Sequence, residues 1–155
     1  MIQQEKIFDF RLVLFGIALV LIQIFSSMYQ FFPTFVGVFF CYILLEIDKK
    51  EKFFYVFLSF LYLSFYELNK GFFLFSYVIL FMLFYYLFAE RIKGYFTCKN
   101  CVIFIYVFVA YIGHFFLNEL IAYALHEPHP SFSMEYFYYI GFDFIVCSIL
   151  FRTKV

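Results

Sequence analysis

The chain has 155 residues, of which 66% are hydrophobic and only 14% are charged. Soluble domains carry about 25% charged residues, and a domain of this length has too little interior to bury so much apolar surface. The formal net charge is zero, which argues against a nucleic-acid-binding surface. Composition therefore predicts a membrane protein whose outer surface is covered by lipid.

Apolar runs follow one another along the chain, separated by short polar segments. The first, at 10–32, is too long for a signal-peptide core and lacks a cleavage site of small residues, so we interpret it as a retained span. Pro33 opens the second run, because a missing N–H costs least in the first helical turn. The second and third runs are shorter than the roughly 20 residues that cross a bilayer. The segment EIDKKEK between them has six charges in seven residues, so it must lie in water and both runs must cross.

The second half of the chain repeats this design. A polar turn, ELNKG, precedes the fourth run, and its Glu67 and Lys70 need water, so we expect both at the outer surface. A basic segment and a proline-containing loop separate the later runs. We predict an all-α membrane protein of one domain, a bundle of six transmembrane helices at about 10–32, 33–45, 53–66, 71–89, 101–125 and 136–151.

The basic residues predict an orientation. If the amino terminus is cytoplasmic, ten of the eleven Lys and Arg residues lie in cytoplasmic segments, and only Lys70 lies outside. The positive-inside rule favours this arrangement, because all the connecting loops are short. We therefore expect both termini in the cytoplasm.

The cysteines suggest redox or metal chemistry. Cys98 and Cys101 have the C-x-x-C spacing, and Cys41 and Cys147 lie in the cytoplasmic thirds of their spans. Zinc accepts four thiolates in a tetrahedral site, so the four cysteines could bind it together, but a single C-x-x-C is a weak signal for such a site. Because the cytoplasmic side is reducing, we predict free thiols, with no disulfide and no bound zinc.

The loop after the fifth run contains His126 and His129. This His-x-x-His spacing could hold a metal with a third ligand. Pro128 and Pro130 stiffen the loop, which favours a connecting or partner-binding role.

Polar side chains inside the predicted spans are the candidate functional residues. His114 and Asn118 share one face of the fifth span, with Glu119 beside them. Asp143 on the sixth span and Gln23 on the first lie in the same outer half of the membrane. They predict either a proton or substrate site, or a polar intramembrane seam that fixes helix packing or binds a partner's helix. We favour the seam, because no second acid–base pair completes a relay.

Enzymatic motifs do not occur in the sequence. It has no nucleophile elbow, no glycine loop for phosphate and no H-E-x-x-H, and it contains only six glycines. We expect no enzymatic activity and no cofactor.

The whole layout resembles the bacterial rod shape-determining protein MreD family. The similar features are Pro33 at the start of the second span, Glu67 at the end of the third in LSFYELNKGFFLFSY, a long fifth span, and the basic tail FRTKV. The resemblance implies six spans in the bacterial inner membrane and a non-enzymatic scaffold of the cell-elongation machinery. It implies membrane lipid and MreC-like, MreB-like and peptidoglycan-synthase proteins as partners.

Two other functions stay open. That family also resembles the six-helix substrate-binding subunits of vitamin transporters, so a small-molecule-binding subunit is the alternative. A membrane thiol-redox protein is the third. The bulk of Phe and Tyr leaves little room for a ligand cavity of about 300 Å³ or more, so we expect a filled bundle without a specific ligand.

Overall fold

The computed structural model describes residues 2–29, 32–95 and 98–151, and these residues form helices and loops without a strand. The α-helices are α1 (Ile2–Met28), α2 (Val36–Glu46), α3 (Phe53–Lys70), α4 (Ser76–Phe84), α5 (Glu90–Tyr95), α6 (Lys99–Phe108), α7 (His114–Leu125) and α8 (Glu135–Phe151). A short 3₁₀ turn, η1 (Lys50–Lys52), precedes α3. The predicted all-α fold is confirmed.

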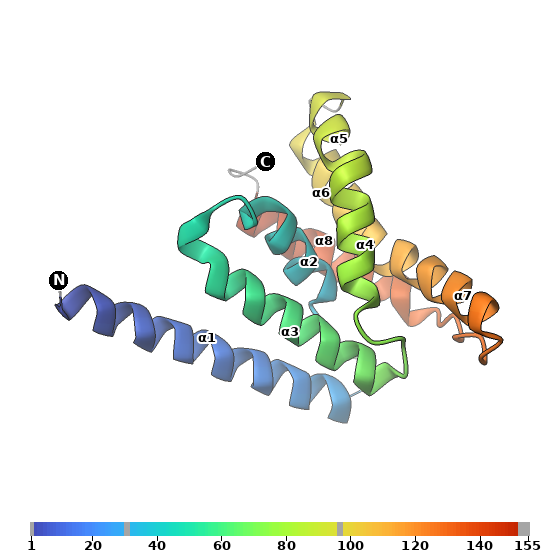
Figure 1. Cartoon of the computed structure of the whole chain (residues 1–155), viewed down its shortest axis with the longest axis horizontal. Coiled ribbons are helices and arrows are strands. Elements are labelled where there is room, and N and C mark those ends of the chain that lie inside the picture. Colours follow the sequence, from blue (N-terminus) through green and yellow to red (C-terminus); the bar gives the residue numbers. More distant parts are fainter. Residues whose placement is uncertain (1, 30–31, 96–97, 152–155) are drawn as a thin grey trace.

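Two π-helical turns connect successive helices without a break. The first, η2 (Tyr85–Ala89), joins α4 to α5, and the second, η3 (Val109–Gly113), joins α6 to α7. In Figure 1, α4 and α5 form one column beside α6, whereas α7 turns away from α6 beyond η3. Such turns often mark functional positions in helices, and η3 here contributes Tyr111 to the site described below.

Helix α2 is the centre of the fold. Nine of its eleven residues are buried, and it packs against α3, α6, α8 and η3. At about 1.5 Å per residue it is only about 16 Å long, roughly half the thickness of a bilayer core. Its sequence, VGVFFCYILLE, is apolar on all sides, as expected for a helix surrounded by others.

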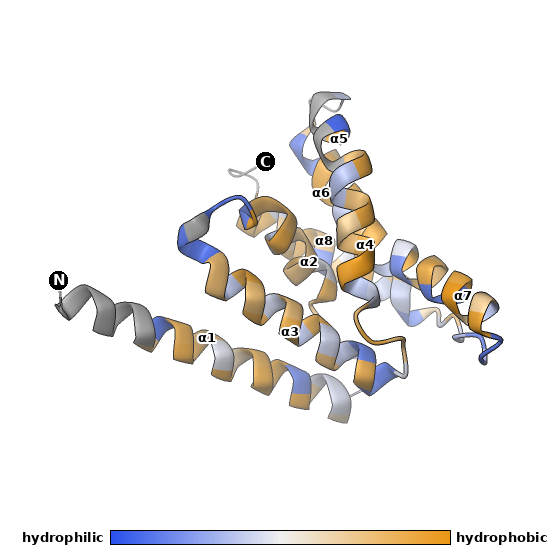
Figure 2. Ribbon diagram, viewed as in Figure 1, coloured by the Kyte–Doolittle hydropathy of each residue, from blue (hydrophilic) through white to orange (hydrophobic). Residues whose placement is uncertain are grey.

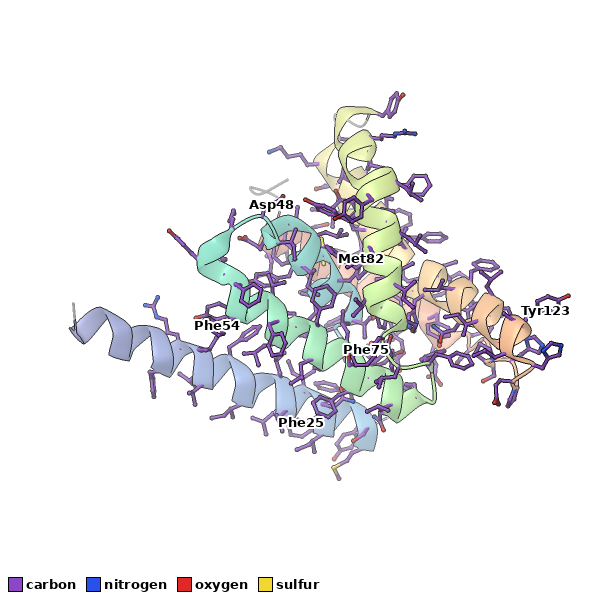
Figure 3. All side chains as sticks on the ribbon, in the orientation of Figure 1. Phe25, Asp48, Phe54, Phe75, Met82 and Tyr123 are labelled. Atoms are coloured by element: carbon purple, nitrogen blue, oxygen red, sulfur yellow. A yellow bond between two sulfur atoms is a disulfide. The ribbon has the colours of Figure 1, made fainter. Side chains whose placement is uncertain are left out.

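Helix α1 lies at the edge of the bundle and packs mainly against α3. Its apolar side chains are about half exposed around most of its circumference, and Figure 3 shows side chains, Phe25 among them, that project away from α3. In Figure 2 the polar residues gather at the ends of the helices and in the loops, while apolar residues cover the helix sides. This surface pattern is compatible with a protein surrounded by lipid.

Among the described residues, two helical segments are long and apolar enough to cross a membrane, Phe10–Met28 and Lys99–Leu125. They coincide with the first and fifth predicted spans. The helices Val36–Glu46 and Ser76–Phe88 are apolar but shorter.

The second and fourth helices begin later than predicted. Helix α2 begins at Val36 rather than Pro33, and α4 begins at Ser76 rather than Gly71. In each case the preceding residue has a left-handed backbone, with φ of 53° at Phe35 and 65° at Phe75, the residue labelled at the foot of α4 in Figure 3. Bulky residues rarely adopt this conformation, which costs about 1–3 kcal/mol. The surrounding structure must stabilise both helix starts.

Candidate functional site

Asp143 of α8 lies at the amino terminus of α2. Its Oδ2 accepts hydrogen bonds from the N–H of Gly37 at 2.8 Å and from the hydroxyl of Tyr111 at 2.7 Å. The Tyr111 hydroxyl also lies 2.9 Å from Oγ1 of Thr34, whose carbonyl accepts a hydrogen bond from the Tyr62 hydroxyl. The carboxylate therefore caps a helix end that carries unpaired N–H groups and a positive partial charge.

The contact between Asp143 and α2 depends on glycine. A Cβ at Gly37 would lie 2.9 Å from Oδ2 of Asp143 and 2.9 Å from Cγ1 of Val107. Asp143 is fully buried, and its Oδ1 has no hydrogen-bond partner within the part of the chain that the structure describes.

Glu67, near the end of α3, performs the same role for α4. Its Oε2 accepts the N–H of Phe75 at 2.7 Å, and its Oε1 accepts the N–H of Tyr77 at 2.6 Å and the hydroxyl of Ser76 at 2.7 Å. The prediction that Glu67 contacts water is wrong, because its side chain is fully buried. The amino terminus of α4 supplies the hydrogen bonds that water would otherwise make.

His114 of α7 adjoins this second carboxylate. Its Nε2 lies 2.7 Å from Oγ of Ser76 and 3.4 Å from Oε1 of Glu67, and its ring stacks on Tyr77 with centroids 3.7 Å apart. In a catalytic triad the acid orients one ring nitrogen and the serine uses the other. Here both partners lie at the same nitrogen and Ser76 is fully buried, so the cluster is not arranged for acyl transfer.

Asn118 completes the same cluster. Its Oδ1 accepts the N–H of Phe73 at 3.0 Å, and its Nδ2 donates to Oγ of Ser76 at 3.0 Å and to the carbonyl of His114 at 2.9 Å. This amide thereby ties the irregular segment before α4 to α7. The Asn118 side chain therefore positions its neighbours, since both its oxygen and its nitrogen are already hydrogen bonded.

The other two predicted residues lie outside these clusters. Glu119 is 40% exposed, and its Oε1 lies 2.8 Å from Nδ1 of His129 in the loop before α8. Gln23 of α1 is half-buried, with its Nε2 3.5 Å from the carbonyl of Phe65 on α3. The predicted residues thus form two separate clusters and two single contacts rather than one seam between the first, fifth and sixth spans.

Hollows occur between α1 and α3 and beneath the loop that precedes α8. The first is an apolar groove of about 410 Å³ lined by Gly16, Leu19, Val20, Gln23, Ile24, Leu58, Leu61, Tyr62 and Phe65. A polar hollow of about 370 Å³ is lined by Gly71, Phe72, Phe73, Asn118, Glu127, Pro128, His129 and Pro130. Of the five predicted seam residues, Asn118 lines the polar hollow and Gln23 the groove.

The prediction of free thiols at the C-x-x-C motif is wrong. Cys98 and Cys101 form a disulfide, and their Cα atoms are 5.3 Å apart, well within the usual range for such a bond. A spacing of three at the start of α6 places the two sulfurs together, and the redox state of the compartment does not reveal this proximity. Cys41 and Cys147 are buried free thiols.

Within the described residues, no group of three or more His, Cys, Asp or Glu side chains is placed to coordinate a metal ion. His129 is instead paired with Glu119.

Comparison with protein-family models, with curated proteins and with solved structures finds no match to this chain.

Proposed function

We propose that the chain is a multi-pass membrane scaffold, non-enzymatic, with six spans and both termini in the cytoplasm. The support for the six spans is the charge pattern of the sequence together with the apolar helix sides. The short α2 crosses because its neighbours surround it and its amino terminus is capped by Asp143 rather than by water.

The observation that supports the scaffold function best is that the buried acids cap helices and are not accessible to a substrate. Glu67 and Asp143 each cap a helix, and His114 is held between Ser76 and Tyr77. These acids and His114 are at most 2% exposed. Groups that bind a substrate or relay a proton need access to it, whereas groups that fix helix packing do not.

The apolar groove between α1 and α3 is the surface on which the scaffold binds a partner's membrane helix. Its lining is almost entirely apolar, and Gly16 has open space where a side chain would stand. Small residues permit close approach of two helix backbones in lipid. Oε1 of Gln23 is buried beside the groove and has no hydrogen-bond partner among the described residues.

The biological role that we propose follows the likeness in layout to MreD. The protein would connect membrane proteins of the bacterial cell-elongation machinery, including MreC-like, MreB-like and peptidoglycan-synthase partners, in the inner membrane. No cofactor or nucleic acid takes part.

The alternative, a substrate-binding transporter subunit, is favoured by one observation. The polar hollow beneath the loop before α8 has a ligand-sized volume of about 370 Å³ and is lined by Asn118, Glu127 and His129. A transporter subunit would retain a small metabolite there through purification, and Asn118→Ala would release it.

Photo-crosslinking in the native membrane tests the scaffold function. A benzophenone side chain at Leu61, which lines the groove, should give a discrete adduct with one membrane protein of the elongation machinery. The same group at Ile149, which is 77% exposed on α8, is the matched control and should give lipid adducts only. An adduct with an ATP-binding transporter component, or equal labelling at both positions, would argue against the scaffold.

A further inference from the structure

We propose that Cys98 and Cys101 form a thiol–disulfide exchange site, in which Cys98 is the attacking thiol and the partner is an exposed thiol or disulfide of glutathione type. The two sulfurs are joined in the structure, and both residues are exposed, Cys98 just before the first turn of α6 and Cys101 within it. The site is distinct from the buried acids and from the groove between α1 and α3.

The position of the pair in α6 distinguishes its two cysteines. Cys98 is the residue before the first turn, and its carbonyl accepts the N–H groups of Cys101 at 3.1 Å and Val102 at 3.2 Å. Among the described residues, no side chain caps this helix end. The N–H groups of the first turn can therefore stabilise a thiolate on Cys98, and Lys99 adds a positive charge beside it.

The exchange needs no reactant other than the disulfide of Cys98 and Cys101 and two partner thiols. In the direction that reduces the pair, a thiolate of the partner attacks Sγ of Cys98, the bond to Cys101 breaks, and the electron pair leaves on Sγ of Cys101, which takes up a proton. A second partner thiol then attacks the mixed disulfide and releases Cys98. One disulfide and two partner thiols give one dithiol and one partner disulfide. In the opposite direction, the thiolate of Cys98 attacks the partner's disulfide.

Accessibility separates this pair from the other two cysteines. Cys41 and Cys147 are completely buried, so a partner of glutathione size cannot reach them. In the proposed topology the exchange site faces the cytoplasm, where a persistent disulfide is uncommon and those that form are usually catalytic or redox-sensing. Measurements on the purified protein report on the exchange site independently of that topology.

Redox titration of the purified full-length protein in lipid nanodiscs is the first test. The protein is equilibrated in glutathione buffers, alkylated without unfolding, and the peptide containing both cysteines is quantified by mass. The pair should pass from about 10% to about 90% reduced over roughly a hundredfold change in the glutathione equilibrium ratio within the physiological range. A pair that stays oxidised, or stays reduced, throughout that range would overturn the proposal.

Trapping of the mixed disulfide is the second test. With glutathione disulfide as the probe, Cys101→Ser should form the adduct at Cys98 at least about tenfold faster than Cys98→Ser forms it at Cys101, because only the first thiolate has the helix end beside it. Cys41 and Cys147 serve as internal controls and should remain unmodified. Equal or reversed rates would refute the assignment of Cys98 as the attacking thiol.

Discussion

Replacing Glu67 by alanine should destabilise the folded bundle by about 2–5 kcal/mol, because three hydrogen bonds of about 0.6–1.7 kcal/mol each are lost in a buried setting. The N–H groups of Phe75 and Tyr77 and the hydroxyl of Ser76 would be left without their acceptor. Phe75 would also keep its unfavourable left-handed backbone without compensation. The measurement is unfolding by SDS in mixed micelles, followed by far-ultraviolet circular dichroism.

Two further variants distinguish capping from a general effect of removing an acid. Glu67→Gln retains one acceptor oxygen but places an NH₂ group against a donor, so it should lose less stability than alanine while remaining clearly weaker than the native protein. Glu127→Ala removes an exposed acid from the loop before α8 and should change stability by no more than about 0.5 kcal/mol. If Glu67→Ala proved as stable as Glu127→Ala, the capping role would be refuted.

Gly37→Ala should cost about 2–4 kcal/mol, from overpacking of about 1–3 kcal/mol and a weakened hydrogen bond to Asp143. The new Cβ would stand 2.9 Å from Oδ2 of Asp143 and equally close to Val107, so α2 and α8 must move apart. Thermal unfolding in detergent measures the loss, and tyrosine absorbance reports the change around Tyr111.

The matched control for that variant is Gly141→Ala on α8. A Cβ at Gly141 meets nothing within 4 Å, so alanine there should stabilise the helix by about 0.5–1 kcal/mol through its better helix propensity. A stable Gly37→Ala protein would show that α2 and α8 do not approach each other this closely.

The long apolar segments and their polar connections could be predicted from the sequence, because helix length and solvation depend on local composition. The starts of α2 and α4 could not. Pro33 favours a helix start, yet the chain continues to Phe35 before α2 begins. What moves the start is the carboxylate of Asp143, which lies more than one hundred residues further along the chain.

The two clusters around Glu67 and Asp143 also could not be predicted from local sequence patterns. The sequence identifies Asp143 and His114 as polar groups within predicted spans, which is a property of each residue alone. Their partners, Gly37 and Ser76, are ordinary residues in apolar runs, and only the packing of α2 on α8 and of α4 on α7 brings them together. The sequence places Glu67 in water because a charged side chain in a turn needs solvation, and no local pattern reveals that the start of α4 solvates it instead.

Accessibility labelling of two loops tests the six-span topology most directly. Lys49→Cys and Ser131→Cys, each in a protein in which Cys98 and Cys101 are serine, place exposed thiols between the second and third spans and between the fifth and sixth. A membrane-impermeant maleimide applied to intact spheroplasts should label the thiol at position 131 at once and the thiol at position 49 only after the membrane is permeabilised. Labelling of both thiols from the same side would contradict the six-span bundle with cytoplasmic termini.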